Sequence, residues 1–187
     1  IVGCRTGYKD EYGRCIMLPM PGLLQKLTGT DITDFTFTSP AEDTPCAEWD
    51  GEIFAMPVYN DVMLPLEGTQ VLAKFTSSYY AGEAALTEHT YGEGCVLHLA
   101  GAFTVESTRR ILAHLELLEP MRQLAAAPEN VELVMREKNG QRWLLALNYQ
   151  DVPVTVELKK PMVSMLSGHV GSGAITLPPY SAEVWKV

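Results

Sequence analysis

Apolar and polar residues alternate in short blocks along the first 125 residues, and turn residues separate these blocks. Alternation with a period of two is typical of half-buried strands, whereas an apolar stripe that recurs every three to four residues is typical of a helix. This mixture predicts an α/β domain. The expected helices are 19–29 and 105–121, and the expected strands are 1–5, 31–39, 48–55, 61–66, 69–82, 84–90 and 95–100.

Turn and cap signals refine these expectations. Gly29 is expected to close the first helix in a left-handed conformation. In the second helix an apolar stripe runs from Ile111 to Leu118, and Pro120 is expected to end it. The sequence YGEG at 91–94 predicts a tight hairpin turn between the two strands that flank it.

The pattern changes to short strands alone after residue 125. Turn sequences such as KNG and PPY separate them, which predicts a small antiparallel sandwich or barrel. We therefore expect two domains, 1–125 and 126–187. The expected strands of the second are 131–137, 141–149, 152–159, 162–168, 173–178 and 181–187.

The chain begins inside a predicted strand and has no initiator methionine. We therefore expect the first domain to be truncated at its N-terminus and the chain to be a fragment of something longer. Trimming of a disordered N-terminus is the alternative.

The composition excludes some classes of partner. The 187 residues are 47% hydrophobic and 20% charged, with a net charge of −9 and no Lys/Arg cluster. Nucleic acid and anionic membrane surfaces are therefore disfavoured as partners. No apolar run approaches 18 residues, so we expect no membrane-spanning helix.

The four cysteines show no metal-type spacing. Each lies in or beside an apolar segment, so we expect four buried and unpaired thiols, although disulfides remain the alternative. Unpaired thiols indicate a reducing, cytoplasmic location. The cysteines are Cys4, Cys15, Cys46 and Cys95.

Two groups of carboxylates are candidates for chemistry. Asp10 and Glu11 in the loop RTGYKDEYGRC at 5–15 are adjacent, so their side chains diverge and do not suit a glycosidase pair. Glu48, Asp50 and Glu52 alternate along a possible strand, which is more typical of a solvated face than of a metal site. We therefore expect no catalytic residue, no metal and no cofactor.

The histidines and tryptophans also favour structural roles. His98 lies opposite Leu97 and Leu99 along its strand, which favours a packed or interface histidine over a general base. His114 is expected beside the apolar stripe of the second helix, whereas His89 and His169 are expected to be exposed.

Trp143 and Trp185 could be sugar-stacking platforms, although core packing is favoured for Trp143. No GxGxxG or Walker motif indicates a nucleotide site.

The order of motifs resembles glycoside hydrolase family 42 β-galactosidases. RTGYKDEYGRC followed by LPMPGLLQKLTGTDITDF at 18–35 is similar to the R-T-G-x-K-D loop, P-G-x-L helix and following strand of that family's middle domain. The run YAGEAALTEHTYGEG at 80–94 resembles its F-Y-A-G, P-A-x-T and Y-G-x-G motifs. The segments ENVELVMRE, WLLALNYQDVPVTVEL and LPPYSAEVWKV resemble its small C-terminal domain, with Tyr149 where histidine is common.

This resemblance implies a non-catalytic part of a larger enzyme. In the family, the catalytic carboxylates of retaining β-galactoside hydrolysis lie on an N-terminal (β/α)₈ barrel, and none of them can be placed on this sequence. The middle domain is glutamine-amidotransferase-like and builds a trimer. The resemblance thus implies a chain for oligomerisation and structural support, with a further copy of itself and the barrel as partners.

The resemblance also implies that the loop at 5–15 is an interface and not an active site. Arg5, Lys9, Asp10 and Glu11 would then form ion pairs that set the register of assembly. Two alternatives stay open. A carbohydrate-binding module would require an exposed Trp143 or Trp185, and a free-standing α/β enzyme would show activity in the isolated chain.

Overall fold

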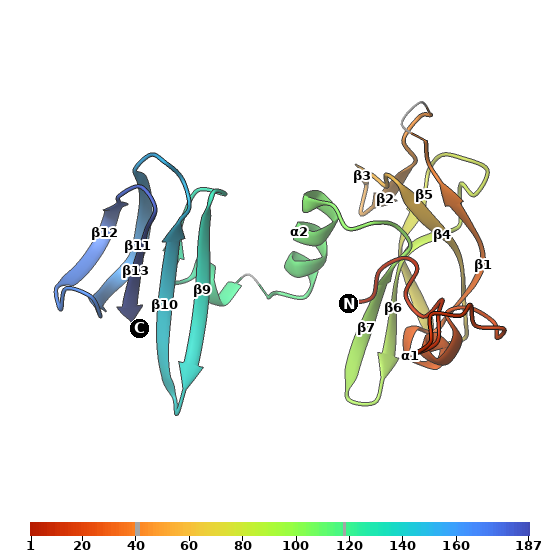
Figure 1. Cartoon of the computed structure of the whole chain (residues 1–187), viewed down its shortest axis with the longest axis horizontal. Helices are drawn as coiled ribbons and strands as arrows, with labels where there is room; N and C mark the ends of the chain where they lie inside the picture. Colours follow the sequence, from red (N-terminus) through yellow and green to blue (C-terminus); the bar gives the residue numbers. More distant parts are fainter. Residues whose placement is uncertain (40–41, 118) are drawn as a thin grey trace. The chain divides into compact units, whose positions relative to one another are not determined.

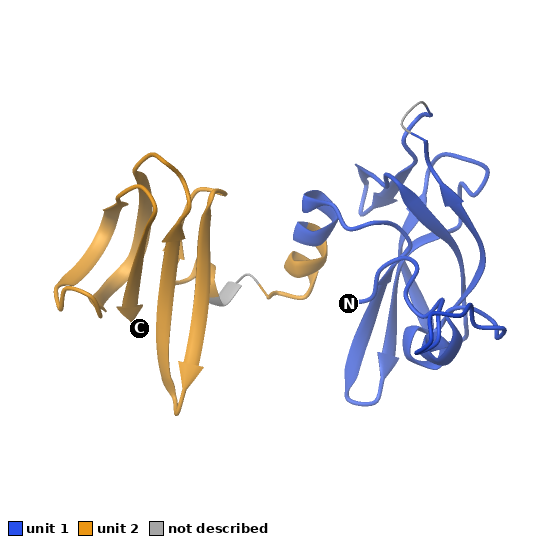
Figure 2. Cartoon of the chain, viewed as in Figure 1, with its two compact units in different colours: residues 1–109 blue, residues 110–187 orange. Residues whose placement is uncertain are grey.

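The computed structural model describes residues 1–39, 42–117 and 119–187. The chain divides into two compact units, residues 1–109 and 110–187 (Figure 2). The division falls inside helix α2 (Val105–His114), so the domain boundary expected near residue 125 stays a prediction.

Unit 1 is built on a seven-stranded sheet with the order β1-β4-β6-β5-β2-β3, and β7 also pairs with β6 (Figure 1). All strand pairs of this sheet in the described chain are antiparallel. The strands are β1 (Thr30–Phe37), β2 (Cys46–Trp49), β3 (Glu52–Ala55), β4 (Tyr59–Pro65), β5 (Thr69–Phe75), β6 (Ala84–Tyr91) and β7 (Gly94–Leu99).

Several expectations for unit 1 are confirmed. Strands β6 and β7 form the expected hairpin, in which Tyr91 pairs with Gly94. The first helix consists of a 3-10 turn (Gly22–Leu24) and α1 (Gln25–Thr28). Gly29 ends it with φ of 64°, and its N–H donates to the Gln25 carbonyl, as a left-handed C-cap does.

Three expected strands of unit 1 are wrong in whole or in part. Strand β5 ends at Phe75, so residues 76–82 of the expected strand 69–82 are not strand. In 1–5 only Val2 forms a β-bridge, because the chain turns at Arg5, which has φ of 61°. The segment 48–55 is not one strand but the turn and arms of the β2–β3 hairpin. Asp50 and Gly51 reverse the chain there with φ of 52° and 82°.

The expected helix 105–121 is also shorter than its apolar stripe suggests. Helix α2 ends at His114, and Glu116 adopts a left-handed φ of 55°. Pro120 lies inside a separate short helix, α3 (Glu119–Arg122), because proline is tolerated in the first turn of a helix.

The expected α/β fold of residues 1–125 is not confirmed. More of the described residues of this part lie in strands than in helices, and their sheet is antiparallel. One parallel contact does occur. The N–H of Val2 donates to the Leu97 carbonyl at 2.7 Å, and the N–H of Leu99 donates to the Val2 carbonyl at 2.9 Å.

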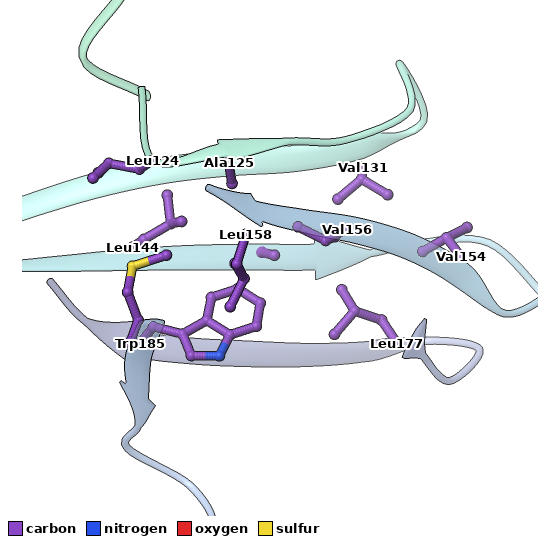
Figure 3. Close-up of a cluster of buried hydrophobic side chains, with 11 residues drawn as sticks. Leu124, Ala125, Val131, Leu144, Val154, Val156, Leu158, Leu177 and Trp185 are labelled. Atoms are coloured by element: carbon purple, nitrogen blue, oxygen red, sulfur yellow. The ribbon is translucent and has the colours of Figure 1, made fainter. Parts of the chain in front are cut away.

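Unit 2 is an antiparallel β domain, as expected, which is consistent with the sandwich of the sequence-based prediction. Its six-stranded sheet has the order β12-β11-β13-β10-β9, and β8 pairs with β11. Trp185 is 1% exposed and packs with Leu144 and Leu158 in the core (Figure 3). The strands are β8 (Ala125–Ala126), β9 (Val131–Lys138), β10 (Gln141–Asn148), β11 (Val154–Ser164), β12 (Val170–Leu177) and β13 (Ser181–Lys186).

Two strands that were expected to be separate in unit 2 form a single strand in the structure. The predicted break between 152–159 and 162–168 lies inside β11, where the register with β12 shifts between Leu158 and Met162. Pro161 lies at this irregularity, a position at which a sheet tolerates proline because no ladder hydrogen bond is required. The proline therefore marks a bulge and not the end of a strand.

Candidate functional site: a polar loop anchored on Asp61

The site is built around a carboxylate inside a buried strand. Strand β4 has the sequence YNDVMLP, and its residues from Tyr59 to Met63 are all buried. Asp61 in this run has no exposed surface. A buried carboxylate needs hydrogen-bond donors, because an unpaired one costs several kcal/mol.

The loop at 5–15 supplies these donors. The backbone N–H of Arg5 donates to Asp61 Oδ2 at 3.0 Å, and the Tyr8 hydroxyl donates to Oδ1 at 2.7 Å. Burial raises the pKa of Asp61, while the hydrogen bonds from Tyr8 and Arg5 oppose this shift. Burial and the adjacent Asp61 also raise the pKa of Tyr8 far above its usual range.

Aromatic rings fix the loop from the other side. The Arg5 guanidinium carbon lies 5.0 Å from the centroid of the Tyr59 ring, within the range of a cation–π contact. Phe35 of β1 stacks on Tyr59 with centroids 5.6 Å apart, and Tyr8 meets Phe35 edge-on at 6.1 Å. The start of the loop is thus held by both charge and packing.

The tip of the loop is a small hairpin organised by Asp10. Its Oδ1 accepts the N–H groups of Tyr12 at 2.9 Å and Arg14 at 2.8 Å. Lys9 pairs antiparallel with Cys15. This Asx-type turn uses the Asp10 carboxylate to shape the backbone.

Two glycines allow the loop to lie against the first helix. A Cβ on Gly7 would lie 2.3 Å from the Pro21 carbonyl oxygen, and one on Gly22 would lie 2.9 Å from Ile16 Cδ1. Both residues have positive φ, 78° and 64°. Any side chain at Gly7 would therefore separate the loop from the segment at Pro21.

The four predicted interface residues thus have different positions. Arg5 covers Tyr59, and Asp10 is engaged within its own turn. Lys9 and Glu11 are exposed. Their role in an interface stays a prediction.

The residues that anchor the loop were not among those predicted from the sequence. Asp61, Tyr8 and Tyr59 hold the loop, yet none of them was singled out. An aspartate inside a largely apolar strand such as YNDVMLP is the signal that could have found it, because such a carboxylate must have partners when it is buried.

The other carboxylates do not form a site. The Glu48–Asp50–Glu52 row is split by the hairpin turn, and Glu48 Oε1 accepts the N–H of Gly51 at 2.8 Å. Within residues 1–39, 42–117 and 119–187, no group of three or more His, Cys, Asp or Glu could hold a metal ion.

His98 is a packed histidine, as expected. It is fully buried, its Nδ1 lies 2.8 Å from the Thr30 hydroxyl, and burial lowers its pKa to about 4. The neighbouring Leu97 and Leu99 are buried too, so both faces of β7 are covered here. His89 is half-buried beside the Leu27 carbonyl, so its expected exposure is wrong.

The tryptophans do not support a sugar-binding module in unit 2. Trp185 is fully buried, and Trp143 is half-buried. The cysteines are free, but Cys15 and Cys95 are exposed, so their expected burial is wrong. The helices of the described chain are all too short or too polar to cross a membrane.

The geometry of the Asp61 site favours a structural role. Both carboxylate oxygens of Asp61 are occupied and shielded from solvent, so the group can neither attack a substrate nor exchange protons with one. Its effect is to fix the backbone of the loop on the sheet and so to present Lys9 and Glu11 at a defined place.

Comparison with known proteins shows the family. The β-galactosidase trimerisation domain matches residues 1–119, and the β-galactosidase C-terminal domain matches residues 130–186. The chain belongs to the glycoside hydrolase family 42 β-galactosidases. It matches their non-catalytic trimerisation and C-terminal domains, and the described residues contain no (β/α)₈ barrel.

Curated relatives are similar over most of this chain. β-Galactosidase BgaB of Geobacillus sp. (strain Y412MC61) is 26% identical over 90% of the chain and 25% of the relative. β-Galactosidase BgaA of Clostridium cellulovorans is 24% identical over 98% of the chain and 28% of the relative. The chain therefore spans about a quarter of the length of these relatives.

Solved structures share the fold. A β-galactosidase from Bacillus circulans sp. alkalophilus superposes with a TM-score of 0.79 at 22% identity, over 98% of this chain and 28% of that one. The E323A catalytic mutant of Gan42B, a GH42 β-galactosidase from G. stearothermophilus, gives 0.78 at 18% identity, over 98% and 27%.

Proposed function

We propose that this chain is the non-catalytic C-terminal portion of a β-galactosidase and serves self-association and structural support. The match of residues 1–119 to a trimerisation domain carries the proposal. Retaining hydrolysis of terminal β-D-galactosides would belong to a barrel that is not among these residues. A reducing, cytoplasmic location is part of the proposal, supported by the four free thiols.

We propose that the loop at 5–15 forms part of the surface through which the chain self-associates. Rigid presentation reduces the entropy that association must overcome, and the contacts of Asp61 and Asp10 supply that rigidity. Lys9 and Glu11 are exposed on the loop and carry opposite charges, which suits recognition of a complementary surface. Arg5 and Asp10 are the other two predicted interface residues. Arg5 lies against Tyr59, and Asp10 is engaged within the turn of the loop.

The α/β fold expected for residues 1–125 is also part of the proposal. We place residues 1–125 in a partial α/β domain and residues 126–187 in the β domain. The parallel contact of Val2 with β7 supports this, since parallel pairing is typical of α/β sheets. The helix α2 that follows β7 fits the same arrangement.

Solution mass tests the proposal. Light scattering across a concentration series is expected to give a trimer for the chain as it stands. The double variant Lys9→Glu/Glu11→Lys keeps the net charge but reverses both exposed charges of the loop, and is expected to shift the mass toward the monomer. We avoid Asp10 because its carboxylate holds the turn.

A matched control exists on β11. Glu157→Lys/Lys159→Glu exchanges two exposed charges at the same spacing and is expected to leave the mass unchanged. A monomer at every concentration would contradict self-association by this chain. A trimer that survives the Lys9/Glu11 exchange would remove the loop from the interface but not the family assignment.

A further inference from the structure

Unit 1 contains a cavity that the loop at 5–15 does not use. It has a volume of about 480 Å³ and lies between the end of β1 and the segment that follows β5. This is within the roughly 300–1,000 Å³ typical of small-molecule sites. Residues that line it include Thr38, Glu42, Asp43, Ser77, Ser78 and Tyr79.

The most prominent group at the cavity is an exposed but fixed aromatic ring. Tyr79 is 69% exposed, yet its hydroxyl donates to Asp34 Oδ2 at 2.6 Å. That hydrogen bond raises the pKa of Tyr79 to about 12 and lowers the pKa of Asp34. An exposed tyrosine held at its far end cannot rotate freely, so its ring face is pre-organised for a ligand.

A buried aromatic ring packs against Tyr79. Tyr80 is 2% exposed and meets Tyr79 edge-on with centroids 4.9 Å apart. Tyr80 itself packs edge-on against Phe75 at 4.6 Å, and its hydroxyl accepts a hydrogen bond from Thr36 at 3.2 Å. Tyr79 is therefore connected to the buried core of unit 1 through Tyr80 and Phe75.

The backbone around the cavity is strained. Ser78 has φ of 73° and lines the cavity. Val58 has φ of 71°, a rare conformation for a β-branched residue, and its carbonyl accepts the N–H of Thr38 at 2.7 Å. Such strain persists only where the surroundings enforce it, and it is concentrated at binding sites.

The chemistry of the lining selects the ligand class. Glu42 and Asp43 are acidic, and the described lining holds no Lys or Arg, so phosphate and other anions are excluded by charge. Carboxylates and the hydroxyls of Ser77 and Ser78 suit a ligand rich in hydroxyl groups. An exposed aromatic face suits the apolar C–H face of a sugar ring, because such a ring presents both surfaces at once.

We propose that this cavity binds a neutral saccharide, with one sugar face on Tyr79 and sugar hydroxyls on the carboxylates. The site goes beyond the proposed function and does not depend on self-association. It also differs from a sugar site on the tryptophans of unit 2.

Amide NMR of the chain titrated with lactose tests the proposal. Saturable shifts centred on Ser78 and Tyr79 are expected, with a Kd of about 1 mM, typical of a small ligand in an open site. Tyr79→Ala is expected to weaken binding about tenfold, the effect of one lost aromatic contact. Asp34→Ala keeps the ring but frees it, and is expected to weaken binding by a smaller factor.

Tyr91→Ala is the matched control. Tyr91 is also an exposed tyrosine, at the β6–β7 turn, and its removal is expected to leave the affinity unchanged. Shifts that do not saturate by about 50 mM, or that persist equally in Tyr79→Ala, would overturn the proposal. Binding of tetramethylammonium without binding of lactose would overturn it too, in favour of a cation site.

Discussion

The Tyr8 hydroxyl donates a hydrogen bond of 2.7 Å to the carboxylate of Asp61, which has no exposed surface. This contact joins a polar loop near the start of the chain to strand β4 in the sheet. The second carboxylate oxygen accepts the N–H of Arg5, so both oxygens of Asp61 accept hydrogen bonds from the loop. The order of the loop and the stability of unit 1 are therefore coupled.

The first prediction follows from this coupling. Tyr8→Phe leaves Asp61 Oδ1 buried without its donor, which is expected to lower the free energy of unfolding by about 1–3 kcal/mol. Urea unfolding followed by circular dichroism measures this change. Tyr12→Phe removes a hydroxyl from an exposed ring of the same loop and is expected to be neutral. Equal effects of the two substitutions would contradict a structural role for the Tyr8–Asp61 bond.

The contacts of Asp61 also show which part of the structure could not be predicted from the sequence. The hairpin β6–β7 and the left-handed Gly29 could be predicted, because each depends on residues within a few positions. The partners of Asp61 are 53 and 56 residues away, and no local pattern indicates them. The same holds for Tyr79, whose fixed position depends on Asp34.

Errors in the predicted strands have a similar cause. Strand β11 continues past Pro161 with a shift in its register to β12, although a proline in isolation favours a break. The turn at Asp50 separates carboxylates that alternate along the sequence. Conversely, the antiparallel β fold of unit 2 was predictable, because short strands and turn residues follow each other without interruption.

A second prediction concerns Gly29. A Cβ at this position would lie 2.1 Å from Thr69 Oγ1 and 2.5 Å from the His89 ring, and φ is 64°. Gly29→Ala is therefore expected to combine the left-handed penalty, about 1 kcal/mol, with a steric clash, and to exceed about 2 kcal/mol in total.

Gly68→Ala separates these two contributions. Gly68 has φ of 81° but no atom within 4 Å of its Cβ position, so only the backbone penalty is expected there. Thermal unfolding of both variants gives the comparison. A Gly29→Ala variant no less stable than Gly68→Ala would show that the clash is relieved by local movement.

A third prediction concerns the core of unit 2. Trp185 is 1% exposed and lies among Leu144 and Leu158 (Figure 3). Trp185→Ala is expected to destabilise unit 2 by about 3–5 kcal/mol through the cavity it leaves. Hydrogen exchange should show lost protection in β10 and β13, whereas Tyr180→Ala, at an exposed ring, should not. Full protection of β13 in the Trp185 variant would refute a core role for the indole.

The last prediction is a dependence of stability on pH that arises from His98. Burial lowers its pKa from 6.5 to about 4 in the folded state. Between these values the unfolded chain binds more protons, so the stability that neutral His98 retains above about pH 6.5 is lost as the pH falls toward 4. The loss is about 3 kcal/mol at most, from 1.36 kcal/mol per pKa unit.

Urea unfolding at several pH values between 4 and 7 measures this loss, and His98→Gln should reduce the slope. Asp61, whose pKa is raised, contributes a slope of opposite sign above its ordinary pKa of 3.8, because its folded state takes up the proton first. Wild type and variant must therefore be compared at each pH. His169→Gln is the control, since His169 is exposed. An imidazole of His98 that titrates near 6.5 by NMR in the folded chain would contradict the prediction.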